Sequence, residues 1–178
     1  MALALLQART AAHMGEVPVG AVLVRDGRVL AAAHNRRESD GDPTAHAEML
    51  ALRLAAAEVD GWRLDGSVMY VTLEPCPMCA GALWLARVSR LVYGARDEKA
   101  GAAGTLYNVV ADPRLNHRLQ VDAGLMAEQS SVLLRGFFVA LRSARRGGRR
   151  DAALTMEAGG MQRSMGTCGD DSEGCPSG

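Results

Sequence analysis

The order of apolar and polar positions along the chain predicts strands that alternate with helices. Residues 2–14 form an apolar helical segment that ends at Gly15. Apolar and β-branched runs on both sides of Asp26-Gly27 predict a hairpin, because Asp-Gly is a preferred hairpin dipeptide. Further strands are expected at 67–74, 89–95 and 119–121, and further helices at 45–59, 77–87 and 125–146. This alternation predicts a three-layer α/β/α domain, with one sheet covered by helices on both faces.

The hydrophobic period stops near residue 146. After Gly147 the chain is rich in Gly, Ser, Asp and Met, which predicts a disordered tail over 147–178 behind a single domain over 1–146. No run approaches the roughly 20 apolar residues that a membrane span needs, and the N-terminal segment lacks a signal-peptide pattern. We therefore expect a cytoplasmic protein without a membrane partner, in which thiols stay reduced.

The charge of the chain is balanced, with 20 basic and 20 acidic residues, so the net charge does not indicate a nucleic-acid partner. Its distribution is less even, because one short segment holds a cluster of arginines and no acid: Arg142, Arg145, Arg146, Arg149 and Arg150. On charge alone this arginine cluster is a solvated helix end or a flexible tail.

The segment LEPCPMCAG places Cys76 and Cys79 three residues apart. In a reducing compartment such a pair serves either thiol redox chemistry or metal binding, and two cysteines are at most half of a zinc site. His46 offers a third ligand near the start of the preceding helix, and both cysteines lie at a helix start, where the helix dipole favours the thiolate. One imidazole and two thiolates leave the fourth position for water, which is the arrangement of a catalytic zinc site.

Glu48 follows His46 by two residues and can reach a water in that fourth position. Because a metal lowers the pKa of its water and a nearby carboxylate can take the proton, we expect a hydrolytic centre. Two alternatives stay open: Glu48 is only a favourable acid in a first helical turn, or a fourth ligand from His13, His34 or His117 closes a structural site. Cys168 and Cys175 lie in the expected tail and are not counted as ligands.

The order HAE, then PCPMC, resembles the established signature of the zinc nucleobase deaminases. Within them the chain resembles the bacterial tRNA-specific adenosine deaminases of the TadA type, through the motifs EVPVGAVLV, HNR before DPTAHAEMLALR, MYVTLEPCPMCAGAL, YGARDEKAGAAGTL and NHR. The resemblance implies a cytidine deaminase-like fold with one mixed sheet, and one Zn²⁺ per chain held by His46, Cys76 and Cys79. It also implies that Glu48 is the catalytic acid and base, and that the wobble adenosine of a tRNA becomes inosine.

The resemblance further implies substrate contacts and partners. Asn35 would hydrogen-bond the flipped base, and Asp97 would accept a hydrogen bond from a ribose 2′-OH. A turn role for Asn35 and an exposed loop charge at Asp97 are the alternatives. The pocket walls would be Val19, Leu73 and the backbone of Ala47 and Pro75. The implied partners are a second copy of the chain and a tRNA anticodon stem-loop, whose phosphates would meet the arginine cluster.

Three other functions remain open at this point. A deaminase of a free base or nucleotide, of guanine or cytosine type, would use the same zinc chemistry, and CPMC with Trp84 nearby resembles the guanine deaminases. GARDEKAGAAG resembles the tRNA enzymes instead. An inactive RNA-binding member of the family is opposed by the intact histidine, glutamate and cysteines. A thiol oxidoreductase would need no metal.

Overall fold

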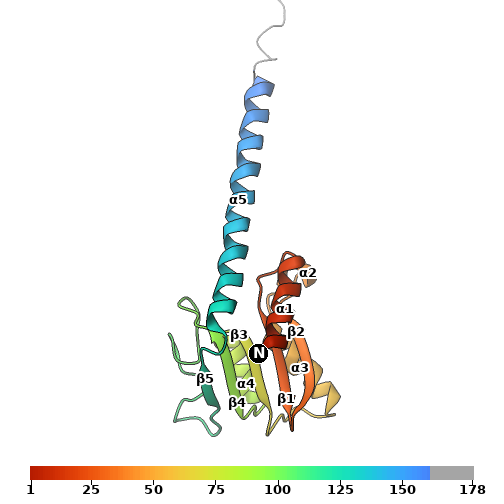
Figure 1. The fold of residues 1–178 in the computed structure, drawn as a ribbon, viewed down its shortest axis with the longest axis vertical. Helices are drawn as coiled ribbons and strands as arrows, with labels where there is room; N and C mark the ends of the chain where they lie inside the picture. The colour runs from red at the N-terminus through yellow and green to blue at the C-terminus, as the bar shows by residue number, and fades with distance from the viewer. Residues whose placement is uncertain (161–178) are drawn as a thin grey trace, which may run out of the picture. The chain divides into compact units, whose positions relative to one another are not determined.

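The protein is described by a computed structural model, which defines the backbone of residues 1–160 and the side chains of residues 1–144. A five-stranded sheet has the order β2-β1-β3-β4-β5 (Figure 1). β1 pairs antiparallel with β2 and β3, whereas β3 with β4 and β4 with β5 are parallel. The sheet is therefore mixed. Its strands are β1 (Gly20–Arg25), β2 (Arg28–His34), β3 (Val68–Leu73), β4 (Arg90–Ala95) and β5 (Gln120–Ala123).

Helices cover the sheet on both faces, which confirms the expected three layers. Figure 1 shows α1 in front of the sheet and α3 and α4 behind it. α1 and α3 both pack against β1 and β2. The helices are α1 (Ala2–His13), α2 (Arg37–Asp40), α3 (Ala47–Glu58), α4 (Pro77–Leu85) and α5 (Ala127–Gly160).

The alternation of side chains along the strands separates the two faces. Ala21 and its neighbours on one face join the main core with residues of α3 and α4. On the opposite face the helices come very close to glycines of the strands. A Cβ at Gly20 would lie 2.1 Å from the backbone oxygen of Ala4 in α1, and one at Gly94 would lie 2.5 Å from Ser130 Oγ in α5. These glycines allow the front helices to rest directly on the strands.

The segment before α3 contains the main local difference from the expected elements. It forms the short helix α2, whose Ser39 N–H donates to Glu16 Oε1 at 2.7 Å, and Arg36 and Asp40 form an ion pair across it at 2.8 Å. These contacts are long-range or depend on side chains, so the hydrophobic period does not reveal them. α3 starts at Ala47 rather than at 45, which makes His46 its N-cap residue.

The last helix is longer than expected, since α5 continues past residue 146 to Gly160. Residues 1–138 form one compact unit, and the described residues from 139 to 160 belong to a second one. The helix thus runs through residues 147–160, the first part of the expected tail. Disorder in the tail stays a prediction, and residues 161–178, with Cys168 and Cys175, lie outside the described residues. No helix within 1–160 is both long enough and apolar enough to cross a membrane.

Candidate active site

Three ligand side chains meet where the N-termini of α3 and α4 converge. His46 is the N-cap residue of α3, Cys76 is the N-cap residue of α4, and Cys79 lies in the first turn of α4. His46 Nδ1 lies 3.7 Å from Cys76 Sγ and 3.5 Å from Cys79 Sγ, and the three ligand atoms all lie within 4.8 Å of one another. In a tetrahedral zinc site, Zn–N of about 2.0–2.1 Å and Zn–S of about 2.3 Å place nitrogen and sulfur about 3.6 Å apart. The three side chains therefore fit a tetrahedral ion.

The cluster has no fourth protein ligand among the side chains of residues 1–144. His34 Nδ1 instead lies 3.0 Å from Gln7 Oε1, and His117 Nε2 lies 2.7 Å from the backbone oxygen of Val88. His13, in the last turn of α1, is not part of the cluster either. Within this part of the chain a bound ion would keep one coordination position free, as in catalytic zinc sites.

The electrostatics of the cluster favour a ligand thiolate. The hydrogen bond from the Cys79 thiol lowers the pKa of Cys76 to about 4 against the opposing effect of burial, and His46 lowers it further. The same contact with Cys76, together with burial, raises the pKa of Cys79. The interaction with Cys76 raises the pKa of His46. The two helix N-termini add partial positive charge beside the sulfurs, which favours the deprotonated form that a divalent metal needs.

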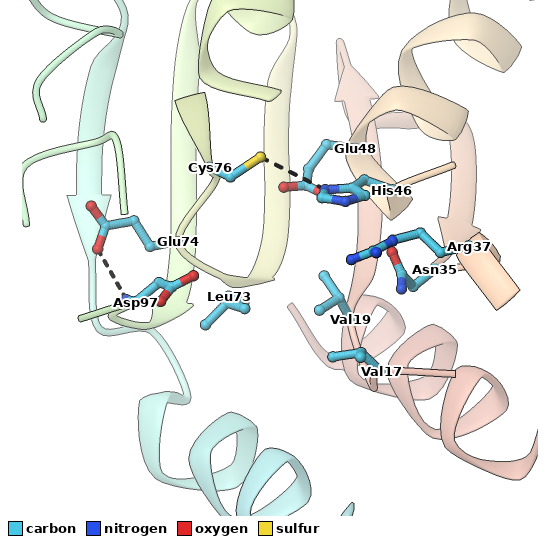
Figure 2. Close-up of a pocket in the computed structure, with 10 residues that line it drawn as sticks. All are labelled: Val17, Val19, Asn35, Arg37, His46, Glu48, Leu73, Glu74, Cys76 and Asp97. Atoms are coloured by element: carbon cyan, nitrogen blue, oxygen red, sulfur yellow. Dashed lines mark hydrogen bonds between the residues drawn. The ribbon is translucent and has the colours of Figure 1, made fainter. Parts of the chain in front are cut away.

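A cavity of about 100 Å³ opens beside the cluster (Figure 2). Glu48 lies on its wall next to His46, only 4% exposed, and burial raises the pKa of its carboxyl. Apolar walls with a few converging polar groups are typical of a site that binds a small planar ligand. The lining residues are Val17, Val19, Asn35, Arg37, His46, Glu48, Leu73, Glu74, Cys76 and Asp97.

Four of the substrate residues expected from the sequence line this cavity, namely Val19, Asn35, Leu73 and Asp97. The Asn35 residue is 5% exposed, and its amide has no hydrogen-bond partner within residues 1–144, so the amide is available to a ligand. Ala47 and Pro75 are buried and do not line the cavity; the Pro75 oxygen accepts a hydrogen bond from Ala102 N–H at 2.8 Å. A contact of their backbones with a base stays a prediction.

Three lining residues were not among those expected: Val17, Arg37 and Glu74. Arg37 belongs to the unexpected helix α2, and Figure 2 shows its side chain above Asn35 at the cavity. Val17 belongs to the same EVPVGAVLV motif as Val19, so the motif did carry a signal for it. Glu74 is 2% exposed and follows directly on β3. An acid between Leu73 and Pro75 at the end of a buried strand is an unusual sequence feature, and it was the signal for this position.

The comparisons with known proteins agree with this geometry. The chain matches the family of MafB19-like deaminases over residues 1–142. The tRNA-specific adenosine deaminase of Bacillus subtilis (strain 168) is 46% identical over 148 residues, which cover 83% of this chain and 92% of that relative. A solved structure from a study of A-to-I editing by tRNA:A34 deaminases at the wobble position of transfer RNA is 46% identical. It superposes with a TM-score of 0.73 over 75% of this chain and 97% of that chain.

A more distant structural relative has a different substrate. A structure of the guanine deaminase from Nitrosomonas europaea is 27% identical, with a TM-score of 0.63 over 76% of this chain and 81% of that chain. The TM-scores show that both solved structures share the fold of this chain, but the tRNA:A34 deaminase structure is closer to it in sequence, at 46% against 27% identity. The chain therefore belongs to the family of the tRNA-specific adenosine deaminases, which have the cytidine deaminase-like fold.

Proposed function

We propose that the chain is a zinc-dependent hydrolytic deaminase that converts adenosine to inosine at the wobble position of a tRNA anticodon. The observation that supports this most directly is the spacing of His46 Nδ1 and the two cysteine sulfurs, which suits zinc, beside the buried carboxyl of Glu48. The identity of 46% to a tRNA-specific adenosine deaminase supports the substrate.

The reaction replaces the exocyclic amine of adenine with oxygen, so that a C–O bond forms at C6, the C–N bond breaks and ammonia leaves. Zinc held by His46, Cys76 and Cys79 would supply a Lewis acid that lowers the pKa of water. Glu48 accepts a proton from the attacking water and donates it to the ring nitrogen next to C6. The same carboxylate then carries the second proton to the leaving amine. One residue thus serves first as base and then as acid.

The remaining lining residues hold the base. Val19 and Leu73 offer apolar contacts to the faces of a planar ring, and the free amide of Asn35 can both donate to and accept from the base edge. A base must leave its stack to enter such a small cavity, which suits an unpaired anticodon loop. The flanking nucleotides then stay outside, near Arg37 and Asp97.

The tRNA contacts that we propose are electrostatic. Arg37 is exposed at the cavity and has no ion-pair partner within residues 1–144, so it can meet a phosphate. Arg142 and the other members of the arginine cluster would add affinity without sequence information. The side chains from Arg145 onward lie outside the described residues. A tRNA substrate would place the enzyme in the cytoplasm.

We also propose a homodimer, formed through an apolar surface over α3 and α4. Trp62 is 62% exposed and Leu85 is 60% exposed, and both line an apolar groove together with Met49 and Leu52. Contiguous apolar patches of this kind mark interaction sites. In light scattering, the wild type should have the mass of two chains and Leu85→Asp that of one; a monomeric wild type would contradict the dimer.

The test of the reaction compares substrates. Ammonia release should occur with a minimal anticodon stem-loop, and inosine should appear at its wobble position. The alternative is a deaminase of a free base, which the likeness to a guanine deaminase favours. Free guanine, adenosine, cytosine and deoxycytidylate are therefore assayed in parallel. If only a free base turned over, the tRNA substrate would be wrong.

The test of the cofactor is a metal analysis. We expect one zinc ion per chain that survives reductant, and loss of activity on chelation. Activity that persists without metal and disappears on alkylation would instead indicate a thiol oxidoreductase. Bound zinc and bound RNA without any turnover would indicate an inactive member of the family.

A further inference from the structure

One buried carboxylate holds the loop that forms the Asp97 side of the cavity. The loop covers residues 96–105. Glu74 Oε1 accepts hydrogen bonds from the backbone N–H groups of Ala103 and Thr105, each at 3.0 Å. Glu74 Oε2 accepts from the backbone N–H of Asp97 at 3.2 Å and from the Thr105 hydroxyl. The carboxylate therefore has donors around both oxygens, and all of them belong to this loop.

The loop encloses the carboxylate without spare room. A Cβ at Gly101 would lie 2.6 Å from Glu74 Cδ, from Glu74 Oε2 and from the backbone oxygen of Asp97. The loop is also tied to the chain next to Glu74, because Ala102 N–H donates to the Pro75 oxygen at 2.8 Å. Only glycine fits at position 101 while these contacts are kept.

The side chain of Asp97 depends on this anchoring. Its Oδ1 accepts from the N–H groups of Lys99 and Ala100 at 2.9 and 3.2 Å, which fixes the carboxylate within the loop. Its second oxygen is left for a ligand at the cavity. Figure 2 shows Asp97 bonded to Glu74, with both lying apart from His46 across Leu73.

We propose that Glu74 is a positioning residue for substrate binding: it fixes loop 96–105, and with it Asp97, at the cavity wall. It therefore sets the KM for an RNA whose flanking ribose meets Asp97, and it leaves the chemical step to Glu48. This inference rests on the proposed function for the nature of the substrate. The anchoring of the loop itself does not depend on that function. Because both Glu74 oxygens are occupied by loop donors, Glu74 is not a second proton carrier.

The variant Glu74→Gln should break the contact at the Asp97 end of the loop and keep the contacts at the Ala103 and Thr105 end. Glutamine keeps the shape but replaces one acceptor oxygen with a donor NH₂ group. At the Oε1 position that group would face two N–H donors, whereas at the Oε2 position the Thr105 hydroxyl can rotate and accept from it. The amide should therefore turn its NH₂ toward Asp97 N–H, and the bond to Asp97 is lost while those to Ala103 and Thr105 remain.

A second variant disturbs the contact between Glu74 and the loop by changing the loop and leaving Glu74 in place. Gly101→Ala pushes against the Glu74 carboxylate and the Asp97 oxygen without changing either side chain. Gly136→Ala in α5 is the matched control, because a Cβ there would meet nothing within 4 Å. If either loop variant fails to fold, Thr105→Val removes only one hydroxyl donor from Oε2 and serves in its place.

Amide hydrogen exchange and steady-state kinetics test the proposal. In Glu74→Gln the Asp97 amide should exchange faster, whereas zinc content and kcat stay as in the wild type. KM for the stem-loop should rise about tenfold, as expected for one lost hydrogen bond to a charged group. With the wild type, a stem-loop that carries deoxyribose at the nucleotides flanking the target should have a higher KM. With Glu74→Gln the same deoxyribose should raise KM no further, because the contact between Asp97 and the ribose 2′-OH is already lost.

Three outcomes would overturn the proposal. These are unchanged Asp97 exchange, a fall in kcat at constant KM, and additive effects of Glu74→Gln and deoxyribose. Failure of the wild type to deaminate the stem-loop would refute the proposed function instead. The exchange measurement would then still decide whether Glu74 holds the loop.

Discussion

The substitution Glu48→Gln tests the centre of the proposed mechanism. Glutamine has the shape of glutamate but cannot carry a proton between the water, the ring and the leaving amine. Glu48 is not one of the three clustered ligand residues, so zinc should stay bound at the wild-type level. The buried amide costs less to desolvate than a carboxylate, so the melting temperature should not fall. Turnover should be lost from a folded, metal-loaded protein.

The size of the loss follows from what surrounds Glu48. A positioned acid or base contributes about 10²–10⁴-fold to a rate, which is about 3–5 kcal/mol of barrier. The other two carboxylates at the cavity cannot replace it. Glu74 is occupied by four loop donors, and Asp97 is bonded to Lys99 and Ala100. Because one residue handles both proton transfers, we expect a fall in kcat of about 10⁴.

The assay is single-turnover inosine formation in a stem-loop, with zinc measured on the same sample. Glu58→Gln is the control, since it makes the same change in the same helix at an exposed side chain, whose one ion-pair partner within residues 1–144 is Arg28. A surface ion pair of this kind is worth at most about 1 kcal/mol, so this variant should keep full activity. Unchanged turnover in Glu48→Gln would remove Glu48 from the mechanism, and loss of zinc would make its role structural.

Three further substitutions test the cluster, the cavity entrance and the packing. Cys79→Ser should abolish zinc binding, whereas His117→Ala should keep the ion, as metal analysis will show. Arg37→Ala should raise KM and reduce the slope of log KM against log salt by about 1, for one lost phosphate contact. Gly20→Ala places a Cβ 2.1 Å from a backbone oxygen of α1. It should lower the free energy of unfolding by about 3 kcal/mol, and with it the melting temperature by about 6–12 °C. Gly81→Ala is the control and should leave the melting temperature unchanged, because a Cβ there would meet nothing within 4 Å.

The parts of the fold that the sequence predicted are those with a local signal. Asp26-Gly27 marked the turn between β1 and β2, and both residues have the positive φ that such a turn needs. Pro77 marked the first turn of α4. The cluster of His46, Cys76 and Cys79 was predictable because HAE and PCPMC each lie at the start of a predicted helix. The structure brings these two helix starts together.

The parts that were missed depend on contacts between distant segments. Helix α2 depends on a hydrogen bond from Ser39 to Glu16, which lies 23 positions earlier in the chain. The local pattern of apolar and polar residues therefore does not predict this helix, nor its residue Arg37 at the cavity. Glu74 bonds to residues 23 to 31 positions away, and its sequence context as a strand end gives no hint of this loop. Side-chain bonds over such separations are fixed only by the assembled sheet.

The site owes its chemistry to the way two helices start. His46 and Cys76 are both N-cap residues with extended backbone, so their side chains turn outward into the space before the first helical turns. The unpaired N–H groups there repel a cation, yet they favour the thiolates that bind it. Two thiolates would cancel the charge of a zinc ion held by this cluster, so the complex would be neutral in a positive field. That field would favour negative charge developing beside the cluster, where the attacking water has to lose a proton. Replacing either cysteine by a neutral histidine would keep the ligand count but remove this balance. Such a variant should therefore bind zinc more weakly and deaminate more slowly than the wild type.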